Sequence, residues 1–345
     1  MITADDLLRC PLTDPTAIYR YRDGLYAADL LTAAMCHLDF FNWLGAHPAD
    51  PATICRSLGL NERPVDVMLT LFTAVGLVQR DGEVFRLTQL AKEHLDPSSP
   101  WCIVPYFGSV KDRPVCRDIA EVLRTGKPAN WASLRNEKEW AKAMETPAFA
   151  SQFTAAMDCR GVYLAPALAQ RLDCAAYHQL LDVAGGSGIY ACAMVARHPQ
   201  LRATVLEKTP VDRLARQALA ERGFSQRVNV GTGDMFQDPF PEGCDIHLFS
   251  NVLHDWDGPQ VEQLLAKSYD ALAPGGMIVV HDAHINPAKT GPLPVAAYSV
   301  LLMTISEGKC YSEVEMADLL ARTGFSNVEY FPTVADRSVI TARKG

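Results

Sequence analysis

A short glycine-rich segment is the first place in this sequence where ligand chemistry is expected. Gly185–Gly188 follows the apolar run Leu180–Val183, and glycine lets a ligand approach the backbone because it has no Cβ. Glu207 ends the next apolar run and is suited to accept two hydrogen bonds from ribose hydroxyls. Gly186–Ala191 also fits the dinucleotide pattern G-x-G-x-x-A, so the motif alone allows a nicotinamide-dependent oxidoreductase.

Histidines and aspartates follow two later apolar runs. They are His254, Asp255, His281, Asp282 and His284. An imidazole has a pKa near 6.5, so it can take up a proton close to neutral pH. Two histidines and a carboxylate can also bind a metal ion. We favour proton transfer at His254, which follows the fourth strand-like run, and expect no metal, although the metal interpretation stays open.

Alternating strands and helices must position these groups. Helical stretches separate most of the successive apolar runs, a pattern typical of a parallel sheet covered on both faces. In such a sheet, ligands bind at the carboxyl ends of the strands. Val328–Phe331 and Ser338–Ala342 are too close for a crossover helix, so we expect them to pair antiparallel. The expected parallel strands are 180–183, 203–206, 228–230, 246–249 and 277–280.

The first hundred residues have the pattern of short helices. Apolar residues at three- and four-residue intervals run through Tyr26–Trp43, and a second helical pattern covers Pro64–Val75. Gly76–Leu87 predicts two short strands joined by an Asp-Gly turn. Helices followed by a hairpin suggest a winged-helix layout. Because this stretch is not basic, it favours a protein–protein interface over DNA binding.

Composition narrows the class of protein. A chain of 345 residues usually forms two domains, and a formal net charge of −8 disfavours nucleic-acid binding. No apolar run is long enough for a membrane span, and the first residues do not resemble a signal peptide, so a cytoplasmic protein is expected. The ten cysteines form no Cys-x-x-Cys pair and are expected to be reduced.

Several motifs in order carry a family resemblance. Gly233-Asp234-Met235, His254-Asp255-Trp256 and Pro274-Gly275-Gly276 follow the glycine loop and Glu207. With these motifs the chain resembles the S-adenosylmethionine-dependent O-methyltransferases that act on small molecules. These include the plant caffeate and hydroxyindole enzymes and bacterial enzymes that modify polyketides and antibiotics.

The resemblance covers nearly the whole chain and implies an α/β architecture. Residues 166–345 would form a class I methyltransferase domain, with a Rossmann-like parallel sheet and one antiparallel C-terminal strand. Residues 1–165 would form an α-helical, winged-helix-like domain that builds a homodimer and helps to close the substrate pocket. The implied partners are a small aromatic substrate and a second copy of the chain, with neither nucleic acid nor membrane.

The resemblance also implies which residues bind S-adenosylmethionine. The glycine loop would admit the amino-acid part, Glu207 would hold the ribose, and Asp234 with Met235 would hold adenine. The full expected set is Asp182, Gly185, Gly186, Gly188, Glu207, Lys208, Gly233, Asp234, Met235, Phe236, Ser250 and Asn251.

His254 matches the catalytic base of the family, and Asp282 matches the carboxylate that steadies it. Plant members have glutamate at that second position. Another family carboxylate would fall at Cys310, where a thiol replaces an anion. This departure puts the usual arrangement around the histidine in doubt. The residues expected to contact substrate are Phe153, Met157, His254, Asp255 and Met303.

Methyl transfer to a hydroxyl of a small aromatic metabolite is therefore the favoured function. The substitution at Cys310 leaves room for methylation of carbon, on an aromatic ring or a 2-keto acid, with or without a metal. The glycine motif keeps a nicotinamide-dependent oxidoreductase as an alternative. A winged-helix regulator that senses a nucleoside is the non-enzymatic alternative.

Overall fold

The computed structural model describes residues 3–129 and 143–345. The chain divides into two compact units. The sheet unit combines Met1–Ala17, Trp140–His284 and Glu313–Gly345, and the helical unit combines Ile18–Glu139 and Ile285–Ser312. Among the described residues, the chain passes from one unit to the other after residues 17, 284 and 312, and again between 129 and 143.

A seven-stranded sheet forms the centre of the sheet unit, in the order β5-β4-β3-β6-β7-β9-β8. β3 to β7 are parallel, and β9 runs antiparallel to both of its neighbours. This arrangement confirms the expected parallel sheet with one antiparallel strand near its C-terminal end. The strands are β3 (Gln179–Val183), β4 (Arg202–Glu207), β5 (Val228–Thr232), β6 (Ile246–Ser250), β7 (Met277–Asp282), β8 (Ser326–Pro332) and β9 (Ser338–Arg343).

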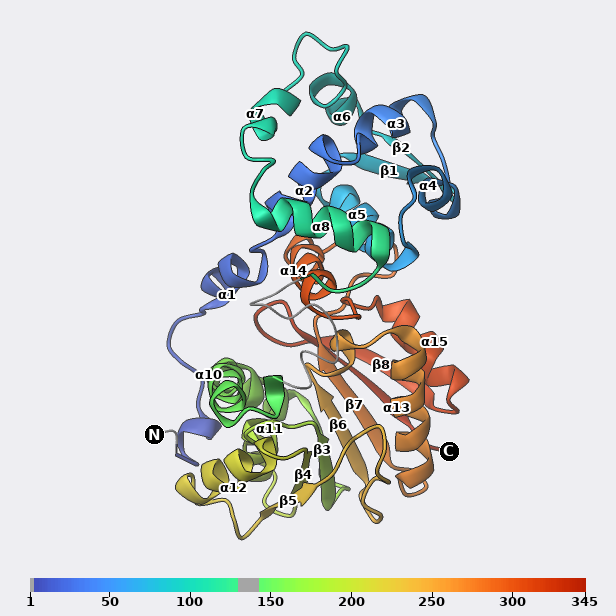
Figure 1. Ribbon diagram of the computed structural model, residues 1–345. Coiled ribbons are helices and arrows are strands. Elements are labelled where there is room, and N and C mark those ends of the chain that lie inside the picture. Colours follow the sequence, from blue (N-terminus) through green and yellow to red (C-terminus); the bar gives the residue numbers. More distant parts are fainter. Residues whose placement is uncertain (1–2, 130–142) are drawn as a thin grey trace. The chain divides into compact units, whose positions relative to one another are not determined.

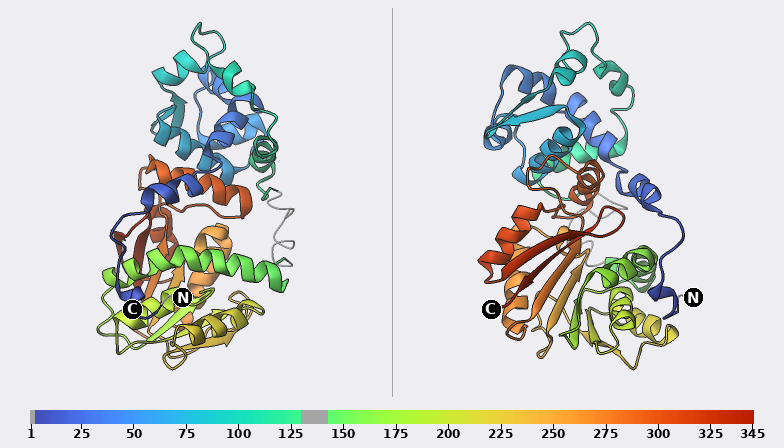
Figure 2. Two further views of the ribbon diagram at one scale, coloured as in Figure 1. Left: turned by 90° about the vertical axis from the view of Figure 1, so that its left-hand side faces the viewer. Right: turned by 180° about the vertical axis from the view of Figure 1, so that it is seen from behind.

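Helices cover both faces of this sheet (Figure 1). On one face lie α11 and α12, with α10 packed against both; α13 and α15 cover the other face. A short 3-10 helix near the N-terminus, η1 (Asp6–Leu8), lies beside α10 and α11 (Figure 2). The helices are α10 (Pro147–Arg171), α11 (Ile189–Arg197), α12 (Val211–Glu221), α13 (Gly258–Ala271) and α15 (Glu313–Arg322).

The strand order reverses between β3 and β6. From β3 the chain continues to β4 and β5 on one side, and then returns to place β6 and β7 on the other side. Connections that leave a sheet in opposite directions open a crevice at the carboxyl ends of the two strands. Val183 and Ser250 end β3 and β6, so the glycine loop and the segment before His254 both begin at this crevice.

The helical unit contains short helices and one hairpin. β1 (Val78–Asp81) and β2 (Val84–Leu87) pair antiparallel around Gly82, as the Asp-Gly turn predicts. The helices are α2 (Ala27–Cys36), α3 (Phe40–Ala46), α4 (Pro51–Leu58), α5 (Glu62–Val75), α6 (Gln89–His94), α7 (Val104–Gly108), α8 (Pro114–Thr125) and α14 (Leu293–Ile305), while α1 (Thr16–Asp23) spans the boundary after residue 17.

Two boundaries differ from the sequence expectations. The apolar pattern over Tyr26–Trp43 is broken, because Asp39 adopts a left-handed conformation (φ 52°) and ends the turn between α2 and α3. The expected division at residue 165 falls inside α10, which packs on α11 and belongs to the sheet unit. The segment 285–312, which carries α14, packs on α5 and belongs to the helical unit.

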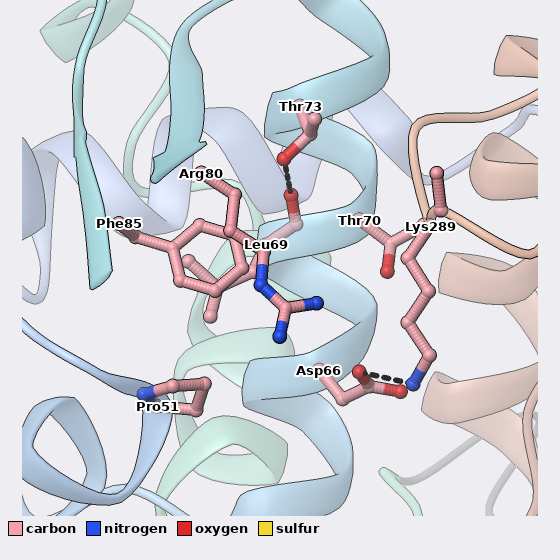
Figure 3. A pocket seen from close by; sticks show the side chains of 9 residues that line it. Pro51, Asp66, Leu69, Thr70, Thr73, Arg80, Phe85 and Lys289 are labelled. Carbon is pink, nitrogen blue, oxygen red and sulfur yellow. Dashed lines mark hydrogen bonds and ion pairs between the residues drawn. The ribbon is translucent and has the colours of Figure 1, made fainter. Parts of the chain in front are cut away.

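A cavity of about 220 Å³ lies in the helical unit (Figure 3). Its wall includes α5, the β1–β2 hairpin and the loop before α14, and the side chain of Arg80 extends toward Asp66. Asp66 Oδ1 pairs with Lys289 Nζ at 2.7 Å, and Asp66 Oδ2 pairs with Lys309 Nζ at 2.5 Å. This cavity shares no residue with the cluster around His254. Within 3–129 and 143–345, no helix has the length and apolar character of a membrane span.

Candidate active site

The glycine loop between β3 and α11 is built from left-handed backbone. Ala184, Gly186 and Gly188 have φ values of 52°, 59° and 76°. A Cβ on Gly188 would meet Val205 Cγ2 at 3.0 Å, so a larger residue there would crowd the neighbouring side chains in addition to straining the backbone. A Cβ on Gly186 would meet no atom within 4 Å, so this side of the loop faces open space. The loop therefore has bare backbone facing open space at Gly186, and its contact with a cofactor stays a prediction.

Glu207 joins this loop to the end of β4. Its Oε1 accepts the Gly186 amide at 2.8 Å, and its Oε2 accepts the Lys208 amide at 3.1 Å. Burial raises the pKa of Glu207 to about 7, against the two amide hydrogen bonds, which lower it. Donors from a ligand would stabilise the charged form further. A half-buried carboxylate beside open backbone fits the hydroxyls of a ribose.

Residues after β5 lie beside Glu207. The Gly233 amide donates to the Glu207 carbonyl at 3.0 Å. Asp234 accepts the Phe236 amide at 2.8 Å and pairs with Lys208 Nζ at 3.1 Å. The Phe236 ring meets Trp256 edge to face at 4.6 Å. The structure thus gathers four predicted cofactor residues, Glu207, Gly233, Asp234 and Lys208, at one edge of the sheet.

Asp182 lies beneath the glycine loop. It is fully buried, and its Oδ2 accepts the Ala191 amide at 3.3 Å. A Cβ on Gly185 would stand 2.5 Å from this carboxyl, so the loop passes directly over it. Burial raises the pKa of Asp182 to about 7. The visible contacts of Asp182 support the loop, and a direct contact with cofactor stays a prediction.

His254 and Asp282 form the central polar pair of the site. His254 lies in the 3-10 helix η2 (Leu253–Asp255) after β6, and Asp282 ends β7. His254 Nδ1 lies 2.6 Å from Asp282 Oδ1, and both side chains are about 5% exposed. The Ala283 amide also donates to Asp282 Oδ1 at 2.8 Å. This contact fixes the orientation of the imidazole, as the family position implies.

The pair shifts both pKa values. Burial would raise the pKa of Asp282, but the charge and hydrogen bond of His254 lower it to about 2. Burial lowers the pKa of His254, whereas the charges of Asp282 and Asp255 outweigh it and raise the pKa above 6.5. Because an ionised Asp282 accepts Nδ1–H, the neutral ring carries its lone pair on Nε2. Nε2 is therefore the nitrogen of the neutral ring that is able to take up a proton.

The pH dependence of activity should report this pair. If His254 acts as a base, kcat should fall with decreasing pH through the pKa of His254, which Asp282 holds above 6.5. Asp282→Asn removes the charge, so the acid limb should move to lower pH and kcat should fall. Turnover measured between about pH 5 and 9 checks this. An acid limb at the same pH in both proteins would contradict it.

The other histidines near these strands have different partners. His281 Nδ1 lies 2.9 Å from Ser250 Oγ, and His284 Nδ1 lies 2.8 Å from Ser338 Oγ. Burial lowers their pKa values to about 3 and about 4, so both are neutral. Asp255 Oδ1 is 3.7 Å from His254 Nε2, beyond hydrogen-bond distance. In the described part of the chain, no group of three potential ligands is arranged to hold a metal ion.

The long helix α10 carries two of the predicted substrate residues. Phe153 and Met157 are half-buried and lie one turn apart, and Phe149 stacks on Phe153 at 6.5 Å. Asp158, next to Met157, accepts a hydrogen bond from Ser187 Oγ in the glycine loop and pairs with Arg222 at 2.6 Å. Sequence analysis missed this connection, because Asp158 and Arg222 are 64 residues apart and belong to no motif.

Met303 and Cys310 belong to the helical unit. Met303 lies on α14 and is fully buried. Cys310 is 3% exposed, and its amide donates to Ser299 Oγ at 3.0 Å. Their places near substrate and near the catalytic histidine stay predictions.

The chain belongs to the O-methyltransferase family, whose domain model matches residues 117–326. The fold is that of class I S-adenosylmethionine-dependent methyltransferases, and the protein is an enzyme of this class. Its cofactor is S-adenosylmethionine rather than a nicotinamide, so the dinucleotide interpretation of the glycine loop is set aside.

Individual members of the family are similar to this chain in sequence and in structure. It is 32% identical over 324 residues to 3-hydroxy-5-methyl-1-naphthoate 3-O-methyltransferase of Streptomyces sahachiroi, covering 91% of this chain and 90% of the relative. An O-methyltransferase family 2 protein from Planctomyces limnophilus, solved with apigenin, superposes with a TM-score of 0.89 at 32% identity over the full length of both chains. Human N-acetylserotonin methyltransferase with its cofactor gives a TM-score of 0.62 at 25% identity, covering 95% and 97% of the two chains.

Proposed function

We propose that this methyltransferase acts on a hydroxyl group of a small aromatic metabolite, with His254 as general base. The observation that carries the proposal is the buried 2.6 Å contact between His254 Nδ1 and Asp282 at the ends of two adjacent strands. A relative named for methylating a hydroxynaphthoate, and a similar structure solved with apigenin, support an aromatic hydroxyl as the acceptor.

Different residues around the crevice would bind different parts of the cofactor. Gly186 and its neighbours would admit the amino-acid part of the cofactor, Glu207 would hold the ribose, and Asp234 would hold adenine. When bound, S-adenosylmethionine supplies a methyl group on a positively charged sulfur, so the leaving group needs no acid. The protein must therefore align the acceptor and remove its proton.

Proton removal is the task of the histidine pair. A phenol with a pKa near 10 is only slightly ionised at neutral pH. His254 Nε2 would take the proton as the new bond forms, and Asp282 would stabilise the resulting imidazolium through Nδ1–H. The raised pKa of His254 brings it closer to that of the phenol, which makes the transfer more favourable.

The identity of the methylated atom tests this proposal. Purified protein is incubated with S-adenosylmethionine carrying a ¹³C methyl group and a panel of hydroxylated naphthalenes and flavones. The expected product shows the methyl carbon bonded to oxygen in its NMR spectrum. A methyl group bonded to a ring carbon would replace the proposal with C-methylation, the alternative that Cys310 suggests.

We also propose that the chain forms a homodimer through its helical unit. Large apolar side chains are exposed on that unit, among them Ile18, Tyr21, Trp101 and Tyr106, and exposed apolar surface commonly marks an interface. Sedimentation should give twice the chain mass of 37.8 kDa. The double substitution Ile18→Asp with Tyr21→Asp should shift the protein toward monomer. A wild-type protein that sediments as a monomer at micromolar concentration would contradict the dimer.

A further inference from the structure

The cavity of the helical unit has a wall of mixed apolar and charged character (Figure 3). Its volume of about 220 Å³ is several times the roughly 30 Å³ that one water molecule occupies in the liquid, so it can hold a small organic molecule. All of its lining residues belong to the helical unit. They are Pro51, Asp66, Leu69, Thr70, Thr73, Arg80, Phe85, Ala288 and Lys289.

The acidic residue among these described lining residues is already paired. Asp66 Oδ1 lies 2.7 Å from Lys289 Nζ, and Asp66 Oδ2 lies 2.5 Å from Lys309 Nζ. The three side chains are between 13% and 32% exposed, so water screens these ion pairs only in part. Each carboxylate oxygen has an ammonium group beside it. Asp66 therefore does not require a cationic ligand in the cavity.

Arg80 offers an unused donor at the same cavity. Its Nε donates to the Gly82 carbonyl at 2.7 Å, and its Nη2 donates to Glu83 Oε1 at 2.5 Å. Its Nη1 makes no hydrogen bond in the described part of the chain, and Figure 3 shows the guanidinium extending toward Asp66. Glu83 is 78% exposed, so water screens its charge. The guanidinium of Arg80 can therefore bind an anion in the cavity.

Two threonines of α5 line the cavity, and their hydroxyls are used differently. Thr73 Oγ1 donates to the Leu69 carbonyl at 2.7 Å (Figure 3). Thr70 is only 5% exposed, and its side chain makes no hydrogen bond among residues 3–129 and 143–345. Buried polar groups in native proteins nearly always have a partner. Because Thr70 lines the cavity, a ligand there would supply the missing partner.

We propose that this cavity binds a small organic carboxylate. The Thr70 hydroxyl and Arg80 Nη1 donate to the carboxylate oxygens, and the ammonium of Lys289 adds positive charge beside them. Leu69 and Phe85 contact the apolar body of the ligand, a contact that a bare oxyanion such as phosphate cannot make. The cavity shares no residue with the cluster around His254, so this inference does not rest on the proposed function.

Fluorine NMR titration of the full chain tests the ligand class, with 4-fluorobenzoate as the probe and adenosylhomocysteine present at saturation. The wild-type protein should bind 4-fluorobenzoate with a Kd of about 1 mM or below. Binding of 4-fluorobenzamide, which has the same shape without the charge, and of inorganic phosphate should be weaker by about tenfold or more. No 4-fluorobenzoate binding up to about 10 mM, or equal binding of the amide or of phosphate, would overturn the proposal.

Two substitutions with matched controls test the location. Thr70→Val and Arg80→Gln should each weaken 4-fluorobenzoate binding by about tenfold or more. Thr73→Val alters a hydroxyl that already donates to the backbone, and Arg86→Gln alters the hairpin arginine that pairs with Asp81, so both should bind like wild type.

Circular dichroism and thermal unfolding confirm that each variant is folded before binding is measured. Wild-type affinity in both Thr70→Val and Arg80→Gln would place the probe elsewhere and overturn the proposal. An equal loss in Thr70→Val and Thr73→Val would indicate general damage to α5 and would also overturn it. A protein that binds 4-fluorobenzoate as expected but methylates no hydroxyl would contradict the proposed function alone.

Discussion

His254→Ala should lower kcat by about 10²–10⁴-fold while leaving adenosylhomocysteine affinity within a few-fold of wild type. The imidazole is the only proton acceptor assigned to the reaction, and its Nδ1 is already committed to Asp282 at 2.6 Å. Steady-state turnover and calorimetry measure the two quantities. Activity within a few-fold of wild type would contradict a base at this position.

Two further variants separate chemistry from stability. Removing the imidazole leaves the carboxylate of Asp282 buried without its partner, which can destabilise a fold by several kcal/mol. His254→Gln keeps an N–H donor for Asp282 but provides no comparable base, so it should fold well and remain as inactive as His254→Ala. His178→Ala, which alters an exposed histidine of the same unit, should retain wild-type activity.

Glu207→Gln should weaken adenosylhomocysteine binding about 10- to 100-fold, because hydrogen bonds to a charged acceptor are stronger than those to a neutral amide. The wild-type carboxyl, with its pKa raised to about 7, should bind more tightly as pH rises and the group ionises. The glutamine variant should lose that dependence. Calorimetric titrations at about pH 6 and 8 measure both effects.

Glu242→Gln is the matched control, since it makes the same chemical change at an exposed position of the sheet unit. Its affinity should equal that of wild type at both pH values. If Glu207→Gln binds as tightly as wild type at both pH values, the ribose assignment is wrong and another group must hold the nucleoside.

The local parts of the site could be predicted from sequence because short motifs encode them. The spacing from the glycine loop to Glu207 reflects one strand–helix–strand unit, and the structure joins Gly186 to Glu207 at 2.8 Å. The proximity of His254 and Asp282 was also predictable, because one follows β6 and the other ends β7, and these two parallel strands are adjacent. The parallel sheet was also predictable, because short continuous apolar runs separated by helical stretches are typical of strands that are buried on both faces.

Other parts depend on contacts between distant residues and left no pattern to recognise. The link from Asp158 to Ser187 and Arg222 connects three separate elements. Asp39 and Asn251 adopt left-handed backbone, with φ values of 52° and 54°, and no glycine at either position marked this in the sequence. Residues 285–312 belong to the helical unit because α14 packs on α5. A single division of the chain at residue 165 does not anticipate this.

The position of β9 between β7 and β8 means that β7 can complete its pairing only after β9 has been synthesised. β7 pairs with β9 over six residues, from Met277 to Asp282, although about 55 residues separate the two strands in the sequence. Until residues 338–343 leave the ribosome, the nascent chain carries β7 with one open edge, and Asp282 has not yet gained its neighbour Ser338. Such an edge invites pairing with other chains, so chaperone protection is most valuable after β7 has been made and before residues 338–343 are available to pair with it.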